Sequence, residues 1–584
     1  MDSALVQRLN DLQRHRGPDG EGLWSSFGDR IVLGHRRLAI IDLGETGAQP
    51  MSDFTGRWTI TFNGEIYNYR QVRAELEAHG RRFHTNSDTE VLINAVATWG
   101  AEGLRKVRGM FAFALWDDRE KELWLARDPY GIKPLHFGES GGTLWFASQA
   151  RPLSNVAPLS ARRDAAALTA FYLWGYVPEP FTWWADIRML PAGHVLRVRT
   201  GKPLVQSEPF FSLVESYLSR PPAPIEAGEL RAILLDSVRH HLVADTPVGI
   251  FLSAGIDSNV IAALAAEAGT DLRTVTLAFD EYRGTADDEA PLAEATAKVL
   301  GSHHTTVRMG REEFESLIDD YFMRMDMPST DGLNTYLVSH ATAKQGLKVV
   351  LSGLGGDELF GGYPSFRQIP QLLKIGCALS FAGGLGRDAE RLIRLLPAGL
   401  IQPKVSGLLR YSSGIENAYF FRRALHLEAD LGDLLDESWY KPGLEQLLVA
   451  QTLSHIVEPL RTAHASTHAQ IAALESCWYM RNQPLRDTDW ASMAHGLEVR
   501  VPFVDADVLE RLGPAVASVR PPTKADLSAC SSKLSPLISA RPKTGFTTPI
   551  RSWIARDKRA PARGLYGWAE QVHQQFRKAD ARAS

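Results

Sequence analysis

Cysteine is scarce in this sequence, and its placement excludes two common uses of it. The 584 residues include three cysteines, at positions 377, 477 and 530. They have neither the spacing of a metal site nor the density of a disulfide framework. The simplest interpretation is a reduced, cytoplasmic protein.

Long apolar runs and an excess of one charge are also missing. No segment is long and apolar enough to span a bilayer, and residues 1–20 lack the apolar core of a signal peptide. The formal net charge is -4, which gives no general attraction for nucleic acid or for an anionic membrane. We therefore expect neither as a partner, and a homodimer is compatible with the sequence.

The residues that are present fall into two halves with different hydrophobic patterns. Up to about residue 215, short β-rich segments such as RIVLGHRRLAIIDL, RWTITFNGEIYN and GMFAFALWD are bounded by Gly, Asp and Asn. Clear helical spacing is confined to residues 69–80 and 88–100. This pattern predicts an α+β domain over residues 1–210, in which a sandwich of sheets packs with helices.

A polar, Pro-rich segment, residues 218–228, leads into the second half. There the predicted strands VGIFL, TVTLAF, HHTTVRM and LKVVLS alternate with helical patterns, which is typical of βαβ units and a parallel sheet. From about 365 to 485 the pattern is mostly helical. The sequence therefore predicts an α/β parallel-sheet domain over residues 228–560 with a helical C-terminal region.

The segment FLSAGIDSN, residues 251–259, lies between a predicted strand and an Ala-rich helix. Open α/β sheets bind ligands at such loops, and the helix N-terminus favours an anion such as phosphate. Ser253 and Ser258 can donate to phosphate oxygens, but Asp257 would repel them unless a cation lies between. Because the loop lacks the Walker A and dinucleotide patterns, it indicates a Mg²⁺–polyphosphate site. The alternative is an ordinary polar turn with a helix cap.

A second loop favours the polyphosphate interpretation. In LKVVLSGLGGDELFGGY, residues 347–363, a predicted strand runs into a Gly-rich loop that carries Asp357 and Glu358. Five glycines lie from position 353 to position 362, more than a plain loop needs, because each glycine loses extra entropy on folding. Two such loops at strand ends would face one crevice, with Asp257 and Asp357 as its metal carboxylates.

Motifs along nearly the whole chain resemble the glutamine-hydrolysing asparagine synthetase family. LSAGIDS is similar to the pyrophosphate loop of ATP pyrophosphatases, and it is accompanied by LSGLGGDELFGGY, LRDTDWASMAHGLEVRVPFVD and RPKTGFTTPI. In the first half, the order of motifs is that of the family's N-terminal nucleophile-type glutaminase domain. These motifs are HRGPDG, HRRLAIIDL, FNGEIYNYRQVR, TNSDTEVL, VRGMFAFALWD and ARDPYGIKPL.

The resemblance implies a ligase that activates a carboxylate with ATP. An acyl-adenylate forms, pyrophosphate leaves, and ammonia derived from glutamine then gives the amide and AMP. By motif position, Asp257 and Asp357 hold Mg²⁺, and Lys543 is a basic residue near the adenylate. The remaining nucleotide positions are Ser253, Gly255 and Ser258 for pyrophosphate, and Leu252, Leu277, Ser352 and Gly353 for adenine and ribose.

The same resemblance implies a glutamine pocket in the first domain. Its positions match Arg37, Asn63, Gly64, Glu65 and Asp88, with Asn63 and Gly64 in oxyanion-type roles. Two plainer interpretations stay open. Residues 63–65 could be a simple turn after a strand, and Lys543 could be a solvated surface lysine.

The N-terminus departs from the family pattern. The family's nucleophile is a cysteine directly after the initiator Met, assisted by its own α-amino group, whereas residue 2 here is Asp. The first strand of the glutaminase domain, which normally precedes HRGPDG, is also missing from the pattern. Either the chain is given without its true start, or glutamine hydrolysis is lost and free or delivered ammonia is used.

Two substitutions bear on the second domain. Leu354 stands where asparagine synthetases commonly carry Glu, and Leu can neither act as a general base nor hydrogen-bond a substrate amine. Ala254 replaces the usual glycine, which is acceptable if its φ is negative. Leu354 argues against aspartate as the acceptor and leaves the ATP chemistry intact.

Three functions follow from these patterns. The default is amidation of aspartate to asparagine with glutamine or ammonia as the nitrogen source. The second keeps the ligase but changes the acceptor to a sugar uronate, a peptide or a secondary metabolite, as Leu354 suggests. The third is a non-catalytic paralogue that binds nucleotide, against which the intact loops argue.

Overall fold

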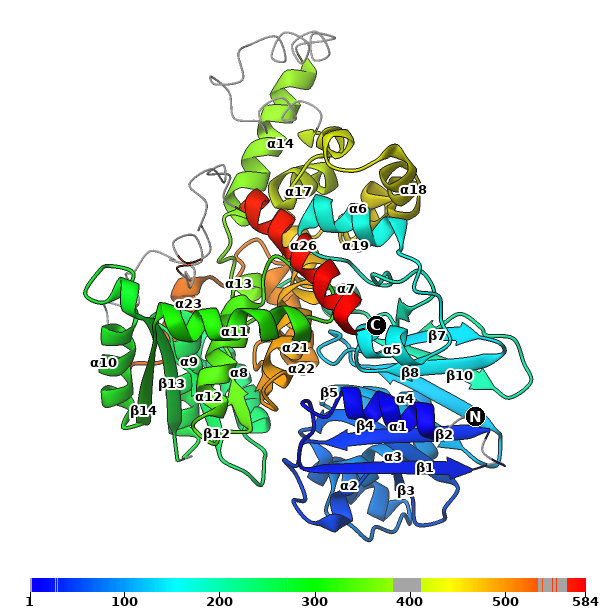
Figure 1. The fold of residues 1–584 in the computed structure, drawn as a ribbon. Helices are drawn as coiled ribbons and strands as arrows, with labels where there is room; N and C mark the ends of the chain where they lie inside the picture. Colours follow the sequence, from blue (N-terminus) through cyan, green and yellow to red (C-terminus); the bar gives the residue numbers. More distant parts are fainter. Residues whose placement is uncertain are drawn as a thin grey trace.

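The computed structural model describes residues 3–26, 28, 30–269, 271–381, 411–533, 538, 549, 553 and 565–583. Antiparallel sheets make up its first part, blue and cyan in Figure 1, and a parallel sheet lies in its second part, in green. No helix within the described ranges is long and apolar enough to cross a membrane.

The strands of the first part form three antiparallel sheets. The largest has the order β11-β10-β6-β5-β4-β3, β1 pairs with β2, and β7 lies between β8 and β9. The strands are β1 (Gly20–Ser26), β2 (Ile31–Arg37), β3 (Met51–Ser52), β4 (Trp58–Ile66), β5 (Gly109–Asp117), β6 (Glu122–Arg127), β7 (His136–Ser140), β8 (Thr143–Ala147), β9 (Arg188–Met189), β10 (His194–Arg199) and β11 (Glu208–Pro209).

Strand β5 shows how these layers pack. Its side chains alternate between the two faces of the sheet, so Phe111 and Phe113 join one apolar cluster while Ala112 and Ala114 join another. The first cluster holds the helices α2 and α3, and the second holds β2. The expected layers of sheets and helices are therefore present. The helices of this part are α1 (Ser3–Leu12), α2 (Tyr69–Ala78), α3 (Asp88–Trp99), α4 (Ala101–Lys106), α5 (Ala150–Val156), α6 (Ala165–Trp174) and α7 (Leu213–Ser216).

The second part is built on a parallel sheet of order β14-β13-β12-β15-β16. Every neighbouring pair is parallel, so all carboxyl ends lie at one edge, and β12 and β15 are adjacent. The two candidate loops follow these two strands. The strands are β12 (Val248–Phe251), β13 (Arg273–Phe279), β14 (His303–Met309), β15 (Val349–Leu351) and β16 (Glu498–Arg500).

Helices cover this sheet and continue beyond it as a mostly helical region, at the top of Figure 1. The last helix, α26, returns to pack beside α11. The helices are α8 (Ala227–His241), α9 (Ile256–Glu267), α10 (Ala290–Leu300), α11 (Arg311–Arg324), α12 (Leu333–Ala343), α13 (Gly356–Leu359), α14 (Ser365–Phe381), α17 (Ile415–Arg423), α18 (Glu437–Leu447), α19 (Val449–Thr462), α20 (Thr467–Leu474), α21 (Pro484–Met493), α22 (Ala506–Val516), α23 (Lys524–Ala529) and α26 (Leu565–Ala583), with a π-helical turn at Glu475–Met480.

Candidate active site

Hydrogen bonds to the serine side chains fix the conformation of the loop between β12 and α9. Ser253 Oγ lies 2.9 Å from Ser258 Oγ, and the Gly255 N–H donates to Ser253 Oγ at 3.1 Å. Ala254 has no positive φ, so its extra methyl group is accommodated without backbone strain. The chain thus turns tightly into the N-terminus of α9, where N–H groups can face an anion and where Asp257 lies in the first turn.

The Gly-rich loop after β15 touches this first loop directly. A Cβ added to Gly353 would lie 2.9 Å from Asp257 Cβ, and one added to Gly356 would lie 2.6 Å from Asp257 Oδ1. A Cβ on Gly362 would lie 1.9 Å from Asp357 Oδ1. These three glycines are therefore required by close approach, and the two loops lie in direct contact; the crevice expected between them stays a prediction.

A lysine that the sequence analysis did not single out joins the two loops. The Lys524 ammonium pairs with Asp257 Oδ1 and, at 2.9 Å, with Asp357 Oδ1. Burial would lower the pKa of Lys524, but the two carboxylates raise it above its usual value, so the amine is charged. Lys524 is the first residue of α23, where the helix dipole disfavours a cation. A lysine at the start of a helix could therefore have indicated, from the sequence, that this residue has an anionic partner.

The two carboxylates fit a magnesium ion. Mg²⁺ prefers oxygen ligands and is usually held by one or two carboxylates together with water and substrate phosphates. In the part of the chain that the structure describes, no group of three or more His, Cys, Asp or Glu side chains could hold a metal. Asp257 and Asp357 would supply the protein's ligands, and the Lys524 ammonium shows that a positive charge fits between them.

The residues expected near adenine and ribose lie at the ends of neighbouring strands. Leu252 is buried, and its carbonyl accepts from Thr276 Oγ1 at 2.6 Å. Leu277 is buried in β13, next to β12. Ser352 follows β15, and its N–H donates to the Arg500 carbonyl at 2.8 Å. The structure thus brings these positions to the carboxyl edge of the sheet, beside Gly353.

Leu354 and Lys543 are the two remaining positions of the second domain that the sequence analysis discussed. Leu354 packs partly buried against the apolar core that also contains Leu252, so it brings no polar atom to the crevice. Lys543 lies outside the described residues.

A polar cavity of about 160 Å³ is lined by the first domain and by Met493 and Glu498 of the second. The five residues expected to bind glutamine all line this cavity. They are Arg37, Asn63, Gly64, Glu65 and Asp88. Residues 63–65 belong to strand β4, so the interpretation of a simple turn after a strand is wrong. Gly64 has a φ of +152°, and a Cβ there would lie 2.1 Å from the Met110 carbonyl oxygen, so no other residue fits.

The carboxyl groups of this cavity are held away from water. Burial, followed by the charges of Asp88 and Glu498, raises the pKa of Glu65 well above its usual value. Burial also raises the pKa of Asp88 to about 6, although the Ile66 N–H donates to Asp88 Oδ2 at 2.9 Å and opposes this shift. The pocket therefore offers buried acids that can share protons with a bound amide or amine.

Arg500 lies between the two candidate sites. It is fully buried, and its guanidinium donates to Glu498 Oε1 at 2.8 Å and lies 3.5 Å from Glu65 Oε2 in the cavity. Its own carbonyl accepts the Ser352 N–H of the Gly-rich loop. One residue thus contacts both sites, and no sequence pattern singled it out.

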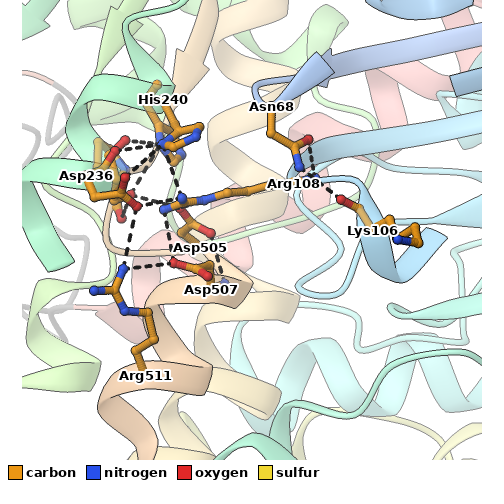
Figure 2. A network of polar contacts seen from close by, with 11 residues as sticks. Asn68, Lys106, Arg108, Asp236, His240, Asp505, Asp507 and Arg511 are labelled. Atoms are coloured by element: carbon orange, nitrogen blue, oxygen red, sulfur yellow. Dashed lines mark hydrogen bonds and ion pairs between the residues drawn. The ribbon is translucent and has the colours of Figure 1, made fainter. Parts of the chain in front are cut away.

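A second arginine, whose side chain is 12% exposed, links the two domains. Figure 2 shows Arg108 reaching from the first domain to Asp236 on α8 and to Asp505 and Asp507 at the start of α22. Arg108 Nη1 lies 2.7 Å from Asp236 Oδ2, and Arg108 Nη2 lies 2.6 Å from Asp505 Oδ2. Burial would raise the pKa of Asp505, but the Arg108 charge holds it below its usual value.

The protein thus combines an antiparallel domain that holds a polar pocket with a parallel-sheet domain in which two strand-end loops bring two carboxylates together. The family model of the glutamine amidotransferase domain matches residues 1–210, and that of asparagine synthase matches residues 229–577. The chain belongs to the asparagine synthase family. It is an enzyme, a carbon–nitrogen ligase of the type that uses ATP to form amides.

Curated relatives match most of the chain. A putative asparagine synthetase (glutamine-hydrolysing) of Mycobacterium tuberculosis is 34% identical over 578 residues, which covers 94% of this chain and 85% of the relative. Asparagine synthetase (glutamine-hydrolysing) 1 of Bacillus subtilis is 32% identical over 568 residues, with 95% and 85% covered. Asparagine synthetase B of Escherichia coli is 31% identical over 386 residues, or 62% of each chain.

Proposed function

We propose that the protein converts aspartate to asparagine, using ATP and Mg²⁺ and releasing AMP and pyrophosphate. The observation that carries this proposal is the pair Asp257 and Asp357, which two adjacent strand-end loops direct at one ammonium group. This geometry suits a metal-bound polyphosphate. The names of the relatives supply aspartate as the acceptor.

The residues of the crevice have distinct tasks in this reaction. Ser253, Gly255 and Ser258 present hydroxyl and N–H donors to the pyrophosphate group at the N-terminus of α9. Leu252, Leu277, Ser352 and Gly353 would hold adenine and ribose, and Lys543 would stabilise charge that develops on the leaving pyrophosphate. A bound Mg²⁺ supplies charge neutralisation on the phosphate oxygens.

The order of bond changes that we propose is the one expected of ATP-dependent amide formation in this family. An oxygen of the acceptor carboxylate attacks the α-phosphorus of ATP, and the bond to pyrophosphate breaks. Ammonia then attacks the acyl carbon, loses a proton, and AMP leaves with the bond electrons. The nitrogen comes from glutamine or ammonia, and the five lining residues Arg37, Asn63, Gly64, Glu65 and Asp88 would hold glutamine.

The ligands of this reaction are small molecules that are abundant in the cytoplasm. We therefore propose a cytoplasmic location, with a carboxylate acceptor and glutamine or ammonia as the partners. A homodimer and the absence of a nucleic-acid partner stay predictions from the sequence.

The test is pyrophosphate release from Mg·ATP with aspartate, and with ammonia or glutamine as the nitrogen donor, while asparagine is followed in the same samples. Asp257→Ala should lower aspartate-dependent pyrophosphate release by a hundredfold or more, because a metal ligand is lost. Asp319→Ala, at an exposed position of α11, is the matched control. Unchanged activity of Asp257→Ala would remove this account of the crevice.

A different carboxylate is the second candidate acceptor, and Leu354 is the observation that favours it. Its apolar side chain packs against the core and offers no hydrogen bond to a substrate amine. Folded, ATP-binding protein that releases no pyrophosphate with aspartate would exclude aspartate. The search would then move to sugar uronates, peptides and other acids.

A further inference from the structure

His35 lines the first-domain cavity and has no task in the function proposed above. It lies on β2 two residues before Arg37, and residues two apart on a strand point to the same face of the sheet. The two side chains therefore start about 7 Å apart, which is short enough for one amino-acid ligand to contact both. His35 is half-buried, so part of its ring stays open beside the expected glutamine site.

The hydroxyl group of Thr61 fixes which ring nitrogen of His35 carries a proton. Thr61 Oγ1 lies 3.0 Å from the Gly34 carbonyl oxygen and 3.1 Å from His35 Nδ1. A hydroxyl has one proton and the carbonyl oxygen can only accept, so the hydroxyl donates to Gly34. His35 Nδ1 must then carry a proton of its own and donate it to Thr61 Oγ1. In the neutral ring the other nitrogen, Nε2, is left as a bare acceptor.

The Nε2 atom of His35 is open to the cavity. It forms no hydrogen bond with any described residue, and it is not among the polar atoms that packing seals from solvent. Removal from water, followed by the charge of Arg37, lowers the pKa of His35 from 6.5 to about 3. The ring therefore stays neutral at ordinary pH, and Nε2 is too weak a base for proton transfer. It is suited to the recognition of an N–H group.

A donor stands next to this acceptor on the cavity wall. Asn63 lies two residues after Thr61 on β4, so the two side chains share one face and start about 7 Å apart. Asn63 Nδ2 lies 3.4 Å from Ser148 Oγ and has a second N–H. Ala112 and Ala114 stand opposite these β4 residues on β5, and their small side chains leave space above the sheet. A primary amide has an acceptor oxygen and N–H donors, and hydrogen bonds of about 2.9 Å on each side let it bridge such a gap.

We propose that His35 selects the carboxamide of glutamine by accepting one of its N–H groups at Nε2, while Asn63 donates to the carbonyl oxygen. A carboxylate or a ketone has no N–H to offer, so glutamate and ketone analogues lack this bond. Thr61 does not touch the ligand and is a positioning residue, since it holds the proton on Nδ1. This inference rests on the proposed function, because it assumes that glutamine occupies the cavity.

Calorimetric titration of the full chain with glutamine and with 5-oxonorleucine measures this bond. 5-Oxonorleucine has the length, charge and carbonyl group of glutamine, with a methyl group in place of the amide nitrogen. We expect glutamine to bind at least about fivefold more tightly, because the analogue lacks one hydrogen bond and leaves Nε2 without a partner. Equal affinities would overturn the inference, since no N–H would then be recognised.

Substitution of His35 tests the acceptor. His35→Phe keeps a flat ring and removes both nitrogens, so the preference for glutamine over 5-oxonorleucine should fall to within about twofold. Affinity for 5-oxonorleucine should persist in this variant, which reports that the cavity is intact. His455→Phe, at an exposed position of α19, is the matched control and should keep the wild-type preference. A His35→Phe protein that keeps the full preference would overturn the inference.

Thr61 gives a second test that leaves the imidazole in place. Thr61→Val has nearly the same shape but cannot accept from Nδ1, so the proton can move to Nε2 and the preference should fall severalfold. Thr61→Ser keeps an accepting hydroxyl and should keep the preference. A purely structural role of Thr61 would change both affinities together, whereas loss of the fixed proton changes their ratio. The same ratio in the wild type and in Thr61→Val would overturn the assignment of Nε2 as the acceptor.

These outcomes are separate from those of the proposed function. Wild-type preference in both His35→Phe and Thr61→Val would overturn the inference and leave aspartate-dependent pyrophosphate release with ammonia untouched. A preference that depends on His35, in a protein that makes no asparagine, would support the inference and exclude aspartate as the acceptor. Folded protein that binds ATP but neither glutamine nor 5-oxonorleucine would overturn the inference as well.

Discussion

The role of Lys524 comes from the two carboxylates that surround its ammonium group. Its ammonium lies between Asp257 and Asp357, each of which is about four-fifths buried as a side chain. Without it, two carboxylates would face each other at the mouth of the crevice. The amine thus stabilises in the ligand-free protein the same arrangement of oxygens that a divalent cation would stabilise in the complex.

Replacing this lysine should make stability depend on magnesium. Lys524→Met should lower the free energy of unfolding by about 1–3 kcal/mol, because like charges are left close together. Millimolar Mg²⁺ should restore much of this loss, since an ion that binds only the folded state stabilises it. Thermal unfolding with and without Mg²⁺, with Lys298→Met on α10 as the control, measures the effect. A loss that Mg²⁺ does not reduce would contradict the metal assignment.

Asp487 gives a prediction on pH. Burial, followed by the charge of Asp331, raises the pKa of Asp487 from 3.8 to about 7. The folded protein therefore keeps a proton that the unfolded chain releases near pH 4. The stability gained from this proton is complete below about pH 4 and is lost as the pH rises through about 7.

Asp487→Asn should therefore flatten the pH dependence of stability. Between pH 4 and pH 7, the wild type should lose on the order of a few kcal/mol relative to this variant. Urea unfolding at several pH values measures the difference, with Asp319→Asn as an exposed control. Parallel pH profiles for Asp487→Asn and the wild type would show that Asp487 does not hold a proton in the folded state.

At the scale of single elements, the Gly-rich loop is the most constrained segment of the crevice. Besides the three glycines required by close approach, Gly355 and Gly361 have φ values of +95° and +64°. Both values lie in the left-handed region that side chains rarely adopt. All five glycines noted in the sequence thus have a structural reason, and none is a spare spacer.

Gly353→Ala should damage the crevice more than its size suggests. Its Cβ would lie 2.9 Å from both Asp257 Cβ and Ser258 N, so the two loops must move apart. We expect ATP affinity to fall tenfold or more and stability to fall by about 1–3 kcal/mol. Gly228→Ala on α8 is the control, because its Cβ would meet no atom within 4 Å. Equal effects of both changes on ATP binding would contradict the close contact of the loops.

Strands β5 and β16 differ in how well a local sequence pattern predicts them. The predicted strand GMFAFALWD is β5 itself, because its hydrophobic residues serve two apolar layers and therefore form a continuous run. Strand β16 was not predicted. Its residues Glu498 and Arg500 are polar, and they become a strand through pairing with β15, which is far away in sequence. Local patterns carry no information on such a partner.

The residues of the candidate sites also differ in whether a local sequence pattern predicts them. Asp257 and Asp357 could be predicted because each lies in a local loop motif at the end of an apolar strand. Lys524 and Arg500 could not, since what matters for them is the distant residues that they contact. Sequence reasoning thus found the parts of the crevice that the sheet positions and missed the parts that packing between distant segments supplies.

At the scale of the whole molecule, Arg108 holds the two domains together. Arg108→Met would leave the buried Asp505 without its main partner, which should cost about 3–5 kcal/mol. Combining it with Asp505→Asn should cost less than the sum of the single changes, because the uncompensated charge is then removed. Urea unfolding of the four proteins gives this coupling energy. Additive losses would show that the pair does not act as a unit.

Arg500 gives the first-domain cavity and the Gly-rich loop of the second domain a direct connection. Its guanidinium lies 3.5 Å from Glu65 Oε2, a residue that lines the first-domain cavity, while its carbonyl accepts the Ser352 N–H of the loop expected to hold ATP. A displacement of Glu65 would therefore reach the Ser352 backbone through the side chain and the carbonyl group of Arg500. We expect a change in the first-domain cavity to reach the Gly-rich loop without a chain of intermediate residues, because Arg500 contacts both.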